Sequence, residues 1–188
     1  MAAMDDIVKA ALAKWPNVPH CHGWLGLDAR GDWYMRDDAT QAAGPFACAT
    51  GRHGSASKGS RLQHGKLIDF IGRNYSADEA GQWFFQNGPQ RVYVELEAAP
   101  YVWRLQPDGA VKAHTGASAG VVNECVVDEF GRLFLATELG FGLVHTNDML
   151  AAADAVEQGR WVPKAQAFAE LPVQWHYVLS PQTRLAEG

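Results

Sequence analysis

Residues 74–96 constrain the fold most, because they contain the signature of a β-hairpin. Two runs rich in aromatic and β-branched residues, 82–86 and 91–96, flank the sequence Asn-Gly-Pro-Gln at 87–90. Asparagine and glycine tolerate positive φ and proline pre-sets a bend, so we expect a four-residue connection between two antiparallel strands. Alternate side chains of the second run would face opposite sides, which predicts a strand buried on one face only.

An Asp-x-x-Gly motif recurs at an identical step of 50 residues, at 28–31, 78–81 and 128–131. Aspartate can bond its own backbone two residues on and glycine takes a positive φ, so each copy predicts a tight turn. Self-similarity at a fixed period is typical of repeated supersecondary units. We therefore predict three related β-hairpins in one antiparallel sheet system, with a pseudo-threefold closed β fold as the alternative.

Two helices are expected near the ends of the chain. Early acids and a following proline favour a helix over 5–14, and a capped alanine-rich run closed by Gly159 favours one over 148–158. Residues 67–71 fit a short strand or a turn of helix, and 171–179 fit an aromatic-rich strand.

These elements predict an α+β protein, mainly antiparallel sheet, in a single domain of 188 residues. The expected parts are an N-terminal helix with a proline linker at 1–19, a β-rich body at 20–179 and a frayed tail at 180–188.

The charge and cysteine content exclude several classes of protein. A formal net charge of −5 argues against nucleic acid as the partner. Three cysteines without a Cys-x-x-Cys pair argue against a disulfide framework and a thiolate zinc site, and suit a reducing compartment. The N-terminus lacks the basic region of a secretory signal and no apolar run reaches spanning length, so we expect a cytoplasmic protein without membrane contact.

Two histidines, His20 and His22, form the best ligand-type cluster. Residues two apart in a strand project to the same face, so both imidazoles can reach one divalent metal, the possible cofactor. The third ligand would be His145, with His114, His176 and Glu138 as the other candidates. Hydrogen-bonded histidines at the surface or in a pocket are the alternative.

A second candidate site combines basic and aromatic residues. Its members can line a pocket for an acidic ligand, and they are Arg73, Tyr75, Arg91, Tyr93 and Trp103, together with Arg104. The same residues equally fit the solvated face of a sheet, with the arginine stems lying on aromatic rings.

The Gly/Ser-rich segment 51–61 resembles an anion cradle, since flexible amides and basic side chains can surround a phosphate. A solvated mobile loop is the alternative. Nucleic-acid binding through 52–66 is a third hypothesis, which the net charge disfavours.

The apolar run 175–179, if it is an edge strand, would favour a homodimer by strand pairing.

Several motifs together are similar to a known family. They are Gly23-Trp24-Leu25-Gly26-Leu27-Asp28 with Gly31-Asp32-Trp33, Arg73-Asn74-Tyr75, the stretch 81–94, and Leu139-Gly140-Phe141-Gly142-Leu143-Val144-His145-Thr146. Over most of its length the chain resembles an uncharacterised proteobacterial family of the domain-of-unknown-function kind. The resemblance implies a bacterial cytoplasmic protein, and it brings no activity, cofactor or catalytic residue.

No complete catalytic constellation stands out in the sequence, and serine and cysteine residues lack recognisable nucleophile motifs. The leading hypothesis is therefore a non-enzymatic, β-rich domain that binds a small molecule or an unknown protein partner. The alternative is a metal-dependent enzyme centred on His20 and His22.

Overall fold

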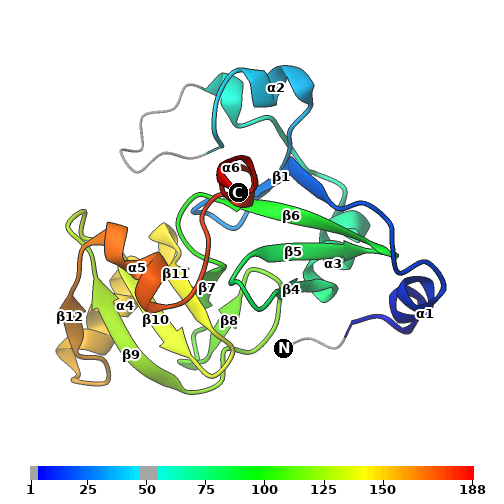
Figure 1. Cartoon of the computed structure of the whole chain (residues 1–188). Coiled ribbons are helices and arrows are strands. Elements are labelled where there is room, and N and C mark those ends of the chain that lie inside the picture. Colours follow the sequence, from blue (N-terminus) through cyan, green and yellow to red (C-terminus); the bar gives the residue numbers. More distant parts are fainter. Residues whose placement is uncertain (1–3, 47–54) are drawn as a thin grey trace. The chain divides into compact units, whose positions relative to one another are not determined.

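The computed structural model describes residues 4–46 and 55–188. The chain divides into two compact units, each with its own sheet (Figure 1). The first comprises Met1–Asp28, Asp32–Glu97 and Tyr177–Gly188, and the second comprises Ala29–Gly31 and Ala98–His176. The β-rich body expected at 20–179 is thus shared between two units.

The first unit is built on a six-stranded sheet in the order β3-β2-β1-β6-β5-β4. Neighbouring strands are antiparallel except β1 and β6, which are parallel. Its strands are β1 (Cys21–Leu27), β2 (Trp33–Met35), β3 (Ser60–Arg61), β4 (Tyr75–Ala77), β5 (Trp83–Asn87) and β6 (Gln90–Leu96). Its helices are α1 (Asp6–Lys14), α2 (Asp38–Ala42), η1 (Ser55–Ser57), α3 (Gly65–Arg73) and α6 (Pro181–Glu187).

The second unit contains a six-stranded sheet in the order β12-β9-β10-β11-β7-β8, with parallel pairs at β12 with β9 and β11 with β7. Its strands are β7 (Tyr101–Leu105), β8 (Val111–Ala113), β9 (Val122–Val127), β10 (Leu133–Thr137), β11 (Phe141–Val144) and β12 (Pro163–Ala165). Its helices are η2 (Thr146–Asp148), α4 (Met149–Glu157), η3 (Phe168–Glu170) and α5 (Leu171–Gln174).

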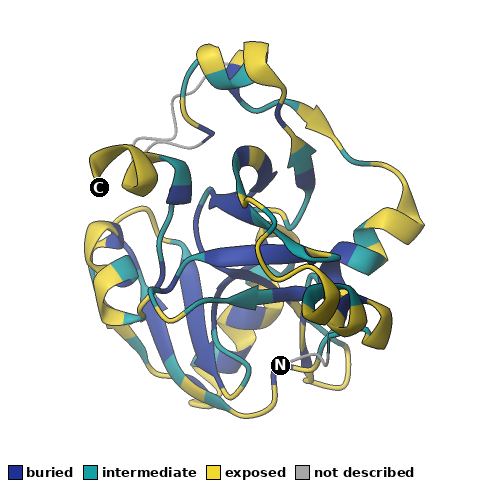
Figure 2. Cartoon of the chain, turned by 45° about the vertical axis from the view of Figure 1, so that its right-hand side comes forward, coloured by how far each residue is buried: buried dark blue, intermediate teal, exposed yellow. Residues whose placement is uncertain are grey.

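The predicted α+β class is confirmed, and so are the two expected helices, observed as α1 and α4. The strands carry most of the buried residues and the helices much of the exposed surface (Figure 2). The single sheet system is wrong, because the strands form two mixed sheets. Parallel pairing requires long crossover connections, which local turn signals do not reveal.

Each Asp-x-x-Gly motif closes an antiparallel hairpin, formed by β1 with β2, β4 with β5, and β9 with β10. The glycines have φ of 83°, 77° and 74°, and each aspartate accepts a hydrogen bond from the amide four residues on at 2.8 to 2.9 Å. The turn chemistry is therefore as expected. Two of the hairpins belong to the first sheet and one to the second, and the 50-residue repeat as a structural pseudo-symmetry stays a prediction.

The hairpin at 74–96 is confirmed as β5 and β6, but its connection is shorter than expected. Asn87 pairs with Gln90, so only Gly88 and Pro89 lie between the strands. The expectation of a half-buried second strand is wrong, since every residue from Tyr93 to Leu96 is buried. The reason is that β6 lies inside the sheet between β1 and β5 and that α6 covers one of its faces, where the Gln182 backbone amide donates to Glu95.

The strand expected over 171–179 is absent from this fully described segment. Pro172 lies in the first turn of α5, the Trp175 amide donates to the Leu171 carbonyl at 2.9 Å, and His176 has φ of 51°. Proline favours the first turn of a helix, and a left-handed residue ends it. The strand that motivated the homodimer therefore does not form.

The tail expected to be frayed at 180–188 contains the helix α6, and the residues just before it are hydrogen-bonded within the first unit. The Leu96 amide donates to the Leu179 carbonyl at 2.8 Å and the Val178 amide to the Gly81 carbonyl at 3.0 Å. Ser180 then caps α6 by accepting from the Thr183 amide at 3.1 Å. Among the described residues, no helix is long and apolar enough to cross a membrane.

A bulge interrupts the parallel pairing of β1 with β6. Cys21 pairs with Val92 and Leu25 with Val94, so four residues of β1 advance against two of β6. Gly23 lies inside the bulge with φ of 85°, and a Cβ there would overlap the side chains of Gln41 and Gln182. Bulges bend a strand and re-aim its side chains, often beside functional sites.

We expect Gly23→Ala to lower the free energy of unfolding by about 1–2 kcal/mol, the cost of a left-handed conformation for a residue with a Cβ. The measurement is chemical denaturation of both proteins. Gly65→Ala is the matched control. Gly65 is the first residue of α3, it has no positive φ, and a Cβ added there would meet no other atom within 4 Å. Alanine there should be neutral or add about 0.5 kcal/mol. Equal effects of the two substitutions would contradict the role given to the bulge.

Candidate functional site

A cavity of about 250 Å³ lies in the first unit, beside the bulge of β1. It is bounded by the sheet and by α3, and all its lining residues except Cys21 and Asn87 have apolar side chains. The lining consists of Cys21, Trp24, Leu25, Met35, Leu67, Phe70, Ile71, Phe85, Asn87 and Val92. Small-molecule sites in proteins are usually concave and mostly apolar, so this cavity is the candidate site.

Strand register explains why these residues share one face of the sheet. Val92 pairs with both Cys21 and Phe85, and directly paired residues lie on the same side. Leu25 pairs with Met35 in the same way. From Cys21 to Leu25, β1 advances four residues while β6 advances only two. This bulge interrupts the pairing of the two strands beside the cavity.

The helix α3 supplies Leu67, Phe70 and Ile71 to the opposite wall. Its hydrophobic residues recur at i, i+3 and i+4, so one face of the helix meets the sheet. Phe70 contacts Phe85 edge to face, with ring centroids 5.4 Å apart at 83°.

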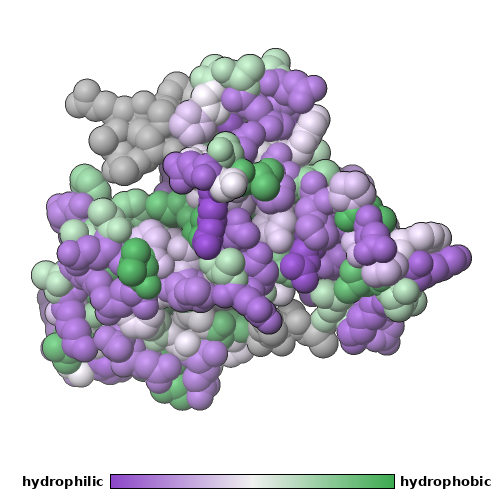
Figure 3. All heavy atoms as spheres, viewed as in Figure 1, coloured by the Kyte–Doolittle hydropathy of each residue, from purple (hydrophilic) through white to green (hydrophobic). Residues whose placement is uncertain are grey.

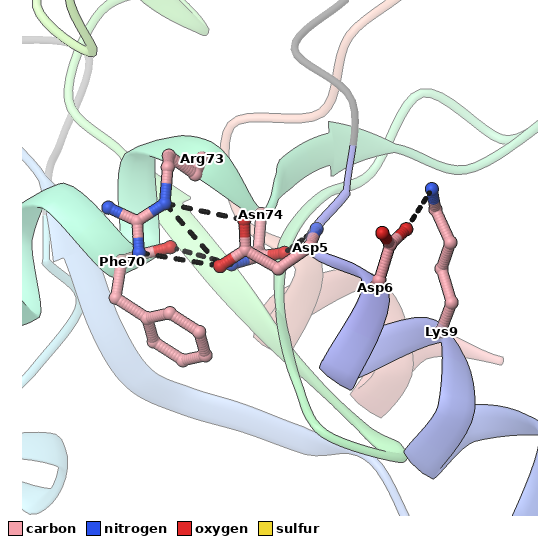
Figure 4. Close-up of polar contacts among 6 residues, drawn as sticks. All are labelled: Asp5, Asp6, Lys9, Phe70, Arg73 and Asn74. Atoms are coloured by element: carbon pink, nitrogen blue, oxygen red, sulfur yellow. Dashed lines mark hydrogen bonds and ion pairs between the residues drawn. The ribbon is translucent and has the colours of Figure 1, made fainter.

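A polar network holds the C-terminal end of α3 (Figure 4). The Arg73 guanidinium donates to Asp5 at 3.3 Å, and the Asn74 amide group donates to Asp5 and to the Phe70 carbonyl at 3.3 and 3.0 Å. The hydrogen bond from Arg73 holds the pKa of Asp5 below its usual range. The start of the chain thereby fixes the end of the helix that carries Phe70.

Of the five residues predicted to bind an acidic ligand, the two tyrosines lie on opposite faces of the first sheet. Tyr75 pairs with Phe85 and faces α3, whereas Tyr93 pairs with Phe84 and lies on the opposite face of the sheet. Arg73 is engaged with Asp5, and Arg91 lies over the Phe84 ring at 4.4 Å.

Trp103, the fifth of these residues, belongs to β7 of the second unit. It is fully buried, and its indole Nε1 donates to the Leu135 carbonyl at 3.1 Å. It is therefore a core residue of that unit. Arg104 lies in an ion pair with Asp148 at 2.6 Å.

The two histidines of the metal hypothesis do lie together. The His22 ring stacks on Tyr93 with centroids 4.4 Å apart, and the His20 ring meets Tyr93 edge to face at 6.0 Å. Burial, together with the charge of His20, lowers the pKa of His22, and His20 Nδ1 accepts from the Arg91 amide at 3.3 Å. These contacts hold both imidazole rings against Tyr93 of β6.

The residues considered as third metal ligand belong to the second unit, where local contacts engage several of them. The Nδ1 atom of His145 accepts from the Asn147 amide at 3.0 Å, that of His114 from the Val102 amide at 3.2 Å, and Glu138 accepts from the Val121 amide at 3.0 Å. Across residues 4–46 and 55–188, no three His, Cys, Asp or Glu side chains are grouped to hold a metal ion. The metal-dependent enzyme has no support from this geometry.

The predicted anion cradle is described only in part, because residues 51–54 lie outside the described residues. Its two described basic side chains are ion-paired. Lys58 contacts Asp28 at 3.2 Å and Glu97 at 3.5 Å, and Arg61 contacts Asp32 at 2.8 Å. Their charges are thus already balanced by carboxylates.

The other face of the sheet contains buried charge that the sequence analysis did not identify. Glu95 is only 3% exposed, and its carboxylate accepts from the Gln182 amide at 2.9 Å. Burial raises the pKa of Glu95 and outweighs both its hydrogen bonds and the attraction of Arg36. Arg36 is fully buried, which lowers its pKa.

The cavity was not expected from the sequence, although one residue gives a signal for it. Gly23 within an otherwise apolar strand is typical of a bulge or a close approach of backbone. The helix at 67–71 was one of two interpretations, and the structure confirms it. Residues on α3, β5 and β6 meet only after the sheet has assembled.

Comparison with known proteins gives a family but no activity. The model of the DUF2944 family, described as "Protein of unknown function (DUF2946)", matches residues 4–185, which confirms the predicted resemblance to an uncharacterised family. No curated protein matches the chain.

Two crystal structures of DUF1285 family proteins are similar to it. The protein from Shewanella baltica OS155 has 16% identity and a TM-score of 0.45, over 70% of this chain and 91% of its own. The protein from Silicibacter pomeroyi DSS-3 has 12% identity and a TM-score of 0.47, over 81% of this chain and 85% of its own. With TM-scores below 0.5, we infer nothing about function from these likenesses.

The raised pKa of Glu95 predicts a pH effect on stability. When the pKa of a carboxyl group is higher in the folded protein than in the unfolded chain, the folded protein binds more protons. The free energy of unfolding therefore falls as the pH rises above the pKa of the group in the unfolded chain. We expect the free energy of unfolding of the wild type to fall relative to Glu95→Gln between about pH 4 and neutral pH.

The measurement is denaturant unfolding of both proteins across this pH range. Glu187→Gln, a change at an exposed residue of α6, serves as the control and should follow the wild type at every pH. A difference between wild type and Glu95→Gln that does not change with pH would refute the assignment.

Proposed function

Because the chain belongs to the DUF2944 family, whose function is unknown, we propose its role from the chemistry of the cavity in the first unit. The protein is a binding domain without enzymatic activity, and its ligand is a small apolar molecule held between α3 and the sheet. The observation that carries the proposal is the cavity of about 250 Å³ with its apolar lining.

The volume suits a compact ligand. An engineered apolar cavity of roughly 150 Å³ in another protein stays dry and binds benzene. The present cavity is larger, so a molecule of one ring with a short substituent fits it. Water gains little there, because a buried water needs several polar partners and the lining provides few.

Three large apolar residues of the lining remain exposed. Trp24 is 39% exposed, Met35 46% and Leu67 38%. They come from three different elements and meet at one cavity, which gives a ligand both a route of entry and apolar surface to cover. On the face of the molecule in Figure 3, by contrast, hydrophobic residues are scattered among hydrophilic ones.

The lining also explains why we propose binding rather than catalysis. Among the described residues that form it, none carries a carboxylate, an imidazole or an amine. General acid–base chemistry needs such a group within hydrogen-bonding reach of the substrate. The Cys21 thiol has no basic side chain beside it in this lining, so the cavity offers no activated nucleophile.

The test uses the methyl group of Met35 as a reporter of binding. Protein labelled with ¹³C at the methionine methyl groups is titrated with toluene and with methylcyclohexane, and the Met35 signal is followed by NMR. We expect a saturable shift of Met35 and none of Met149, which lies in α4 of the second unit. Absence of a saturable Met35 shift with both hydrocarbons would overturn the proposed function.

A filled cavity should lose the ligand. Val92→Phe places a ring in the cavity. We expect the affinity for toluene, measured from the Met35 methyl shift, to fall at least tenfold. Val121→Phe is the matched control, because Val121 is 59% exposed in the second unit. Cys21→Leu fills the same space if Val92→Phe does not fold, and undiminished binding in a folded filled variant would refute the site.

A further inference from the structure

Three aromatic rings and one thioether line the cavity. Trp24, Phe85 and Met35 belong to the sheet, and Phe70 belongs to α3. Aromatic rings attract one another in offset or edge-to-face arrangements, beyond the area they bury. Thioether sulfur makes a further favourable contact with ring edges.

The three rings come from three different elements, and two of them, Phe70 and Phe85, contact each other. Phe85 is 6% exposed on β5, which lies between β4 and β6. Phe70 is anchored by the network of Asp5, Arg73 and Asn74 at the end of α3, and Arg73 also lies over its ring at 5.9 Å. Trp24 lies within the bulge of β1 and is 39% exposed. A ligand therefore meets two rings, Phe70 and Phe85, that are already held in place.

The lining also determines the charge of the ligand. It contains no charged side chain, and its only amide is that of Asn87. Burying a charge without a partner is strongly unfavourable. A carboxylate or an ammonium group on the ligand would therefore have to stay outside.

We propose that the cavity selects a neutral, monocyclic aromatic molecule over an aliphatic one of the same size. This selectivity rests on the proposed function, since it concerns the same cavity. The volume accommodates a ligand of one ring, the lack of charge in the lining favours a neutral ligand, and the three rings with the thioether favour an aromatic one.

The experiment compares toluene with methylcyclohexane, which have the same carbon skeleton, and adds benzoate as the charged analogue. Affinities come from the Met35 methyl titration, and each is divided by the partition coefficient of the compound between water and hexane. This correction removes the general hydrophobic contribution. We expect the corrected affinity for toluene to be about tenfold higher than for methylcyclohexane, and no saturable binding of benzoate.

Two variants test whether the rings cause the preference. Phe85→Leu keeps the wall apolar but removes a ring. The ratio of the corrected affinity for toluene to that for methylcyclohexane should therefore fall at least threefold. Trp24→Leu tests the same point at an exposed residue if Phe85→Leu does not fold. Phe130→Leu is the control, because Phe130 is 60% exposed and lies outside the first unit.

The outcomes separate the two proposals. Equal corrected affinities of toluene and methylcyclohexane, or an unchanged ratio in folded Phe85→Leu and Trp24→Leu, would overturn the aromatic selectivity and leave the binding function standing. Saturable binding of benzoate as tight as that of toluene would overturn the neutral-ligand inference. If neither hydrocarbon binds, the proposed function itself fails.

Discussion

The buried guanidinium of Arg36 is the interaction on which the first unit depends. Its three nitrogens donate to the carbonyls of Ser57, Gly23 and Gly44 at 3.0, 3.0 and 2.7 Å. A buried cation is tolerated only when its donors are satisfied, and planar arginine can satisfy several acceptors at once. One side chain thus fixes the bulge at Gly23 together with the segments that contain Gly44 and Ser57.

The two faces of the sheet in the first unit differ in chemistry. On the α3 side, paired residues such as Val92 and Phe85 line an apolar cavity. On the other side, Glu95 and Arg36 are buried, and α6 donates to Glu95 through the Gln182 amide. Because successive side chains of a strand point to opposite faces, residues next to each other in the sequence lie on different faces of the sheet. The buried Glu95 carboxylate holds the start of α6, and the opposite face of the sheet carries the apolar cavity.

Local signals predicted the parts of the fold that local chemistry controls. The Asp-x-x-Gly turns, the hairpin of β5 and β6, and the helices α1 and α4 depend on residues within a few positions of one another. Residues 171–179 were expected to form a strand, but Pro172 lies in the first turn of α5. Proline fits both positions, and packing decided between them.

The sequence by itself determined the α+β class, the turns and the family of this protein. Only the tertiary structure decided that the strands form two sheets, that Tyr75 and Tyr93 face opposite sides, and that a cavity lies beside the bulge. The physical reason is the distance along the chain between the residues that interact. Turns and helices are stabilised by hydrogen bonds between near neighbours, whereas strand order, register and a cavity wall arise from contacts between residues far apart in the chain.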